Sequence, residues 1–78
     1  MMLTFTLMNK ESQMNHDIQV NSQQKIIDTL HILQEAGTLQ GIDTEQVTVK
    51  SVRRGMYVDI KEIYEEEHIY TGDILELI

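Results

Sequence analysis

The chain has 78 residues and carries 6 Lys and Arg against 13 Asp and Glu, which gives a formal net charge of −7. This length predicts one domain, residues 1–78, with a single apolar core. The negative charge has the wrong sign for attracting nucleic acid or anionic lipid, so we expect neither as a partner. Cysteine is absent, which excludes disulfides, thiolate nucleophiles and thiolate metal ligands.

The sequence also lacks the usual signals for membrane insertion or export. No apolar run approaches the roughly 20 residues that a membrane-spanning helix needs. The segment 1–8 has neither the basic start nor the long apolar stretch of a signal peptide. We therefore expect a cytoplasmic protein, whose acidic charge serves solubility or the binding of a basic partner.

The first predicted elements are two strands joined as a hairpin. In the segment 3–8, Leu and Phe alternate with Thr and Met, a period-two pattern that is typical of a half-buried strand with Thr facing outward. A polar stretch over 9–15 is rich in residues that favour turns. After it, Ile18 and Val20 point one way in a second short strand.

A helix is predicted over residues 22–36. Asn21 and Gln24 have the spacing of a capping box, in which two side chains satisfy the free N–H groups at a helix start. Gly37 stands where a left-handed residue commonly ends a helix. The apolar residues Ile26, Ile27, Leu30 and Leu33 form one stripe along the predicted helix, which should face the core.

The remaining segments predict further strands. A third strand is predicted over 47–52, with Val47, Val49 and Ser51 facing the core. Arg53-Arg54-Gly55 forms the turn into a fourth strand over 57–60. A terminal strand follows Gly72-Asp73. Three tyrosines are expected at the core edge with exposed hydroxyl groups, and these are Tyr57, Tyr64 and Tyr70. The alternative for Tyr70, which lies beside the Gly72-Asp73 corner, is a role in a contact.

This order of elements predicts an α+β fold, a mixed sheet of four to five strands with one main helix packed on one face. The complete pattern resembles the ubiquitin-like β-grasp domains. More narrowly, it resembles the YukD/EsaB family, small ubiquitin-like proteins associated with the type VII (ESX-like) secretion systems of Gram-positive bacteria. The segments that carry this narrower resemblance are Asp17-Ile-Gln-Val-Asn-Ser22, Val49-Lys-Ser-Val-Arg-Arg-Gly55 and Ile69-Tyr-Thr-Gly-Asp-Ile-Leu-Glu-Leu77.

The resemblance implies an accessory or regulatory cytoplasmic component of the secretion system that acts by non-covalent contact with another protein. Ubiquitin-like carriers and modifiers continue beyond the last strand to a flexible Gly-Gly, whereas Ile78 belongs to the predicted strand. A carboxyl-terminal carrier or modifier is therefore a disfavoured alternative. A small structural domain that forms a homodimer through exposed sheet edges is a further alternative, so both a monomer and a weak homodimer stay open.

One set of side chains is predicted to bind a protein partner. By analogy with other ubiquitin-like domains, the sheet face turned away from the helix is the expected recognition surface. Alternation places several apolar residues on that face, beside the basic residues of the Arg53-Arg54 turn. The predicted protein-binding residues are Lys50, Val52, Arg53, Arg54, Ile74 and Ile78.

Other charged residues carry no comparable prediction. Six acids fall in the last 18 residues, and a solvated surface is the simplest interpretation of them, with docking to a basic segment as the alternative. The three histidines lack zinc-ligand spacing, and the acids lack the spacing of a calcium loop. No nucleophile or base motif is present. We therefore predict no catalytic, metal-binding or cofactor-binding residue, and no cofactor.

Overall fold

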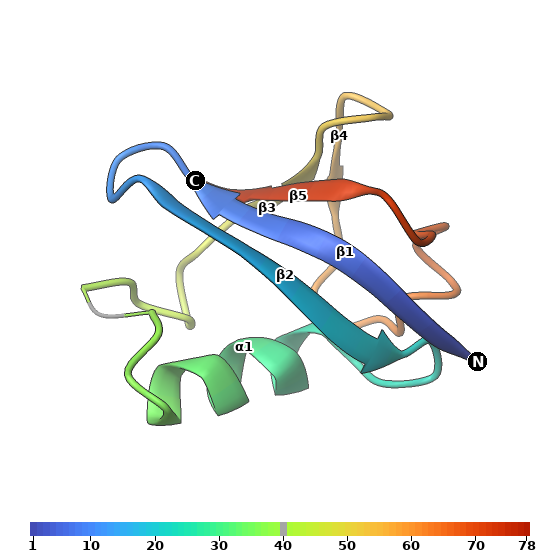
Figure 1. The fold of residues 1–78 in the computed structure, drawn as a ribbon, viewed down its shortest axis with the longest axis horizontal. Helices are drawn as coiled ribbons and strands as arrows, with labels where there is room; N and C mark the ends of the chain where they lie inside the picture. The colour runs from blue at the N-terminus through green and yellow to red at the C-terminus, as the bar shows by residue number, and fades with distance from the viewer. Residues whose placement is uncertain (40) are drawn as a thin grey trace.

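The computed structural model describes residues 1–39 and 41–78 and shows a sheet with helix α1 across one face (Figure 1). The strands lie in the order β2-β1-β5-β3-β4, with β1 and β5 parallel and the other neighbours antiparallel. In chain order the elements are β1 Met2–Asn9, β2 Met14–Asn21, α1 Ile26–Glu35, β3 Val49–Ser51, β4 Met56–Val58 and β5 Ile74–Leu77. The predicted α+β architecture is confirmed.

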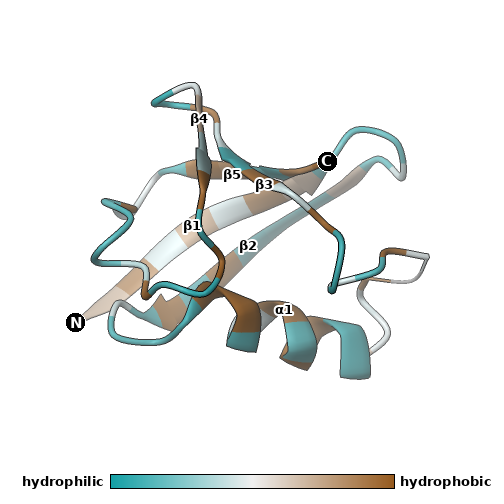
Figure 2. Cartoon of the chain, turned by 180° about the vertical axis from the view of Figure 1, so that it is seen from behind, coloured by the Kyte–Doolittle hydropathy of each residue, from teal (hydrophilic) through white to brown (hydrophobic). Residues whose placement is uncertain are grey.

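The apolar core lies between the sheet and α1. The alternation predicted for β1 is confirmed, because Leu3, Phe5 and Leu7 are buried while Thr4 between them is exposed. Figure 2 shows this alternation as brown and pale bands along β1. The buried apolar side chains are Leu3, Phe5, Leu7, Val20, Ile26, Leu30, Leu39, Val49, Tyr64, Ile69, Leu75 and Leu77.

The start of the helix differs from the prediction, since α1 begins at Ile26 rather than at residue 22. Asn21 still ends β2, and its side-chain oxygen accepts a hydrogen bond from the Gln23 N–H at 2.9 Å, which makes a turn and no helix cap. Lys25 precedes the helix in an extended conformation and provides no side-chain cap. The capping-box prediction is therefore wrong.

Carbonyl groups from a distant segment replace the missing cap. The Ile26 N–H donates to the Glu62 carbonyl at 3.1 Å, and the Ile27 N–H donates to the Ile60 carbonyl at 2.8 Å. These are two of the N–H groups that lack a partner within any helix. The β4–β5 connection thus anchors the start of α1.

The predicted helix end is confirmed. Gly37 adopts a left-handed conformation with φ of 80°. Its N–H donates to the Gln34 carbonyl, and the Thr38 N–H donates to the Leu33 carbonyl at 2.9 Å, which together make a Schellman motif.

Within the two described ranges, no helix has both the length and the apolar character that a membrane span requires.

The third and fourth strands are shorter than predicted, and β3 covers Val49–Ser51 instead of 47–52. Val49 and Ser51 are buried, as predicted. The turn at Arg53-Arg54-Gly55 is also confirmed, with Gly55 at φ of 66° and its N–H bonded to the Ser51 carbonyl. The fourth strand covers Met56–Val58 instead of 57–60, because its pairing with β3 ends where Val58 meets Val49.

Tyr64 corrects a further expectation, because its side chain is only 1% exposed and lies within the core. Its ring packs against Phe5, with the ring centroids 5.4 Å apart. Tyr57 and Tyr70 are exposed. Burial disfavours the charged phenolate and raises the pKa of Tyr64 to about 12.

The free energy of unfolding should therefore fall at alkaline pH because of Tyr64. Because the folded pKa exceeds the unfolded value near 10, the contribution of the neutral phenol is fully present below pH 10 and is lost as pH rises through about 12. From pH 9 to 11, urea unfolding should show the wild type losing roughly 1–2 kcal/mol more than Tyr64→Phe. An equal loss in both proteins would contradict this assignment.

Candidate functional site

The outer face, meaning the side of the sheet turned away from α1, carries two neighbouring apolar residues, Val52 directly after β3 and Ile74 at the start of β5. The register Ser51↔Leu75 places Val52 opposite Ile74, and the Val52 N–H donates to the Ile74 carbonyl at 3.0 Å. Val52 is 44% exposed and Ile74 is 37% exposed, whereas Ser51 and Leu75 next to them face the core. Grouped apolar side chains of this kind are typical of contact surfaces.

A charged row crosses the outer face beside this apolar pair. Lys50 on β3 stands opposite Glu76 on β5. The Nζ atom of Lys10 lies 3.7 Å from Oε2 of Glu76, so two lysines flank one half-buried carboxylate. Tyr57 stands opposite Lys50 on β4, and its side chain is 62% exposed.

Tyr57 is a residue of this face that the sequence prediction missed. The predicted fourth strand had no register, and register alone places Tyr57 beside Lys50. The turn at Arg53-Arg54-Gly55 could have predicted this position, because a tight turn fixes which residues of a hairpin face each other.

Ile78 lies at the other end of the outer face. Its N–H donates to the Thr48 carbonyl at 2.8 Å, and its carbonyl accepts from the Thr48 N–H at 3.2 Å. The side chain is 58% exposed. Ile78 lies four positions after Ile74, about 13 Å along the strand, with the Lys50–Glu76 row between them. The structure thus places Lys50 next to Val52 and Ile74, and Ile78 apart from them.

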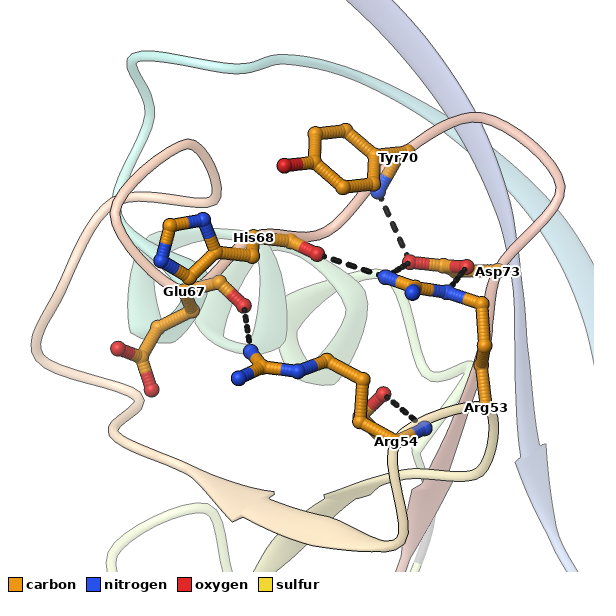
Figure 3. Close-up of polar contacts among 7 residues, drawn as sticks. Arg53, Arg54, Glu67, His68, Tyr70 and Asp73 are labelled. Atoms are coloured by element: carbon orange, nitrogen blue, oxygen red, sulfur yellow. Dashed lines mark hydrogen bonds and ion pairs between the residues drawn. The ribbon is translucent and has the colours of Figure 1, made fainter.

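Arg53 is engaged within the molecule (Figure 3). Its Nε donates to Oδ1 of Asp73 at 2.6 Å, and its Nη2 donates to Oδ2 of Asp73 at 3.1 Å and to the His68 carbonyl at 2.9 Å. The guanidinium carbon also lies 5.4 Å from the centre of the Tyr70 ring. The Arg53–Asp73 pair therefore ties the β3–β4 turn to the segment before β5.

The environment of Asp73 shows why the carboxylate stays charged although only 4% of its side chain is exposed. Burial alone would raise the pKa of Asp73. Hydrogen bonds from Arg53 and from the Tyr70 N–H outweigh this effect, and with the charges of Arg53 and Arg54 they hold the pKa of Asp73 below its usual range. The hydrogen bond to Asp73 raises the pKa of Arg53 in turn.

Arg54 keeps its charge without a carboxylate partner. Its Nη1 donates to the Glu67 carbonyl at 3.2 Å, and among the described residues no acidic side chain lies within ion-pair distance of it. Arg54 is exposed on the same turn that leads from Val52. Of the two arginines predicted to meet a partner, Arg54 has the available charge.

The acids of the last third take different roles. Asp73 is buried, which the interpretation as a solvated surface did not anticipate, whereas Glu62, Glu65 and Glu66 are exposed. The three histidines are exposed as well. Across 1–39 and 41–78, no group of three or more His, Cys, Asp or Glu side chains could hold a metal ion.

Comparisons with known proteins establish the fold. No family model and no curated protein matches the sequence. Among solved structures, a protein designed de novo on the basis of ubiquitin matches with a TM-score of 0.76 and 23% identity, over 99% of this chain and 87% of that one. The N-terminal ubiquitin-like domain of the 4931431F19Rik protein matches with a TM-score of 0.73 and 8% identity, over 99% and 73% of the two chains.

These similarities confirm the predicted ubiquitin-like β-grasp fold. At identities below 25% they carry information about the fold alone. In all, 222 chains of solved structures match. A shared fold does not by itself select a function or a partner.

Replacement of Asp73 by Asn should destabilise the protein at neutral pH by about 1–3 kcal/mol, because the buried carboxylate accepts charge-assisted hydrogen bonds that an amide cannot replace. Since the folded pKa of Asp73 is lowered, its contribution is present above the usual carboxyl range and is lost as pH falls through the lower folded value. The gap between wild type and Asp73→Asn should therefore shrink between pH 5 and pH 2 in urea unfolding.

Asp43→Asn is the matched control. Asp43 is exposed, and its Oδ1 accepts from the Glu45 N–H, a turn contact that asparagine preserves. Its stability should follow that of the wild type throughout this pH range. A gap for Asp73→Asn that stays constant from pH 5 to pH 2 would show that the Asp73 charge has no such role.

Proposed function

We propose that this chain is a non-covalent protein-interaction module whose outer face docks on a partner. The observation that carries the proposal is the exposed apolar pair of Val52, directly after β3, and Ile74, at the start of the neighbouring strand β5. Burial of this pair against a partner would remove apolar surface from water, which stabilises association.

The charges around the apolar pair would orient a partner on the outer face. Arg54 supplies an unneutralised cation at one side, and Lys50 lies in the next row. Charges at the rim of an interface mainly set orientation and association rate. A partner that presents an apolar side chain beside a carboxylate fits this arrangement, and Tyr57 adds an exposed aromatic ring next to Lys50.

We further propose that the module is an accessory or regulatory component of a type VII secretion system in the cytoplasm. The sequence resemblance to the YukD/EsaB family supports this role. Two of the three segments that carry the resemblance contribute to the outer face, namely Val49–Gly55 and Ile69–Leu77. The partner would then be another protein component of that system.

The proposal is tested by capture from a Gram-positive cell lysate, with the partner proteins identified by mass spectrometry. Val52→Asp with Ile74→Asp should reduce capture of secretion-system components at least tenfold, because the substitutions put two carboxylates into an apolar contact. Ile32→Asp is the matched control, since Ile32 is 57% exposed on α1, on the opposite side of the sheet. Circular dichroism would first show that all variants fold.

The result separates the parts of the proposal. Capture that is lost with the Val52 and Ile74 variant and retained with Ile32→Asp supports both the function and the outer face. Equal capture by every variant would overturn the outer face as the docking surface. Specific capture of other proteins, without secretion-system components, would overturn the secretion role.

A further inference from the structure

A hollow of about 410 Å³ opens between the start of β1 and the segment before β5, apart from Val52 and Ile74. Its walls are mainly apolar and come from Met1, Leu3, Ile69 and Tyr70. The volume falls within the range of pockets that hold small ligands or the anchoring side chain of a partner. The residues proposed for docking on the outer face do not line this hollow.

Backbone hydrogen bonds fix the position of these walls. The Ser22 N–H donates to the Met1 carbonyl at 2.7 Å, and the Gly72 N–H donates to the Thr4 carbonyl at 2.9 Å. These bonds join the first residues of the chain to the segments that complete the hollow. A ligand would thus meet a main chain that is already in place around the hollow, which lowers the conformational entropy lost on binding.

The Arg53–Asp73 pair holds the exposed wall. Oδ2 of Asp73 accepts the Tyr70 N–H at 2.9 Å, and the Arg53 guanidinium lies over the Tyr70 ring (Figure 3). The Tyr70 ring is thus held on one side by Arg53, while Tyr70 is 56% exposed. A rigid, half-exposed aromatic side chain is a common anchor for binding.

One acidic side chain lines the opening. Glu65 lies on the rim and accepts a hydrogen bond from Gln23, whereas the exposed Glu66, next to it in the sequence, does not line the hollow. No Lys or Arg lines the hollow among the described residues. The nearby Arg53 has its charge balanced by Asp73. The site therefore combines an apolar interior with one carboxylate, that of Glu65, at its rim.

We propose that this hollow is a second binding site, which takes a large apolar side chain from a peptide segment of a protein partner, flanked in that segment by Lys or Arg. The apolar walls would bury the side chain, and Glu65 would pair with the flanking cation. This specificity is opposite in sign to that of the outer face, where the available charges are basic.

The proposal is tested by ¹H–¹⁵N NMR titration with three capped peptides, Ac-Lys-Phe-Lys-NH₂, Ac-Glu-Phe-Glu-NH₂ and Ac-Lys-Ala-Lys-NH₂. The first should give saturable shifts at the amides of Ser22, Glu65 and Thr71, which line the hollow. The other two should bind at least fivefold more weakly. Preference for the acidic peptide would overturn the proposal.

Two pairs of variants localise the binding. Tyr70→Ala should weaken binding of the first peptide about tenfold. Tyr57→Ala should leave that binding unchanged, although Tyr57 is similarly exposed at 62%. Glu65→Gln keeps an acceptor for Gln23 and should weaken binding about two- to fivefold, as expected for one exposed ion pair. Glu66→Gln should leave it unchanged.

Each remaining outcome decides the question. Equal binding of the phenylalanine and alanine peptides, or equal effects of Tyr70→Ala and Tyr57→Ala, would overturn the apolar pocket. The Val52→Asp and Ile74→Asp variant should bind the first peptide like the wild type. Failure of the hollow and failure of the outer face are therefore distinguishable.

Discussion

The structure depends on the β4–β5 connection, because it supplies the hydrogen-bond partners that α1 cannot supply for itself. A helix leaves its first N–H groups unpaired, and here no side chain caps them. The carbonyls of Ile60 and Glu62 accept two of these groups. The same connection places Tyr64 in the core against Phe5. Helix, sheet and connection are thus joined by hydrogen bonds and by packing at once.

The Arg53–Asp73 pair fixes the far end of that connection. A buried carboxylate is unfavourable unless it is charge-paired and hydrogen-bonded, and Asp73 obtains both from the β3–β4 turn and from Tyr70. One of the two arginines of the turn is consequently used for structure. Arg54 has no carboxylate partner among the described residues, so its charge is available to the proposed docking surface, although the two arginines look alike in the sequence.

The sequence predicted well those features that depend on local spacing. The β1 alternation and the left-handed residue Gly37 are of this kind, since each follows from a residue and its near neighbours. The helix start was wrong because carbonyls more than 30 residues away provide its cap. Tyr64 was misplaced for a similar reason, because its burial depends on how the whole connection folds back.

For the candidate site, the predicted apolar pair lies where alternation placed it, but pairing decides the rest. Asp73 precedes Leu75 by two residues and Leu77 by four, so strand alternation places all three side chains on the core side of β5. Because a buried carboxylate needs a charged partner, this spacing already indicated that Asp73 pairs with a cation. It could not distinguish Arg53 from Arg54, because only the folded turn determines which guanidinium reaches Asp73.

The position of the Arg53–Asp73 pair also bears on how the two proposed surfaces are separated. Arg53 follows Val52 of the outer face directly, and its guanidinium contacts Tyr70, a wall of the hollow. A change in the pair would move elements of both surfaces together. Substitution of Arg53 or Asp73 therefore cannot assign a binding event to either one. Side chains at the two surfaces themselves, such as Ile74 and Glu65, lie outside the pair and can separate them.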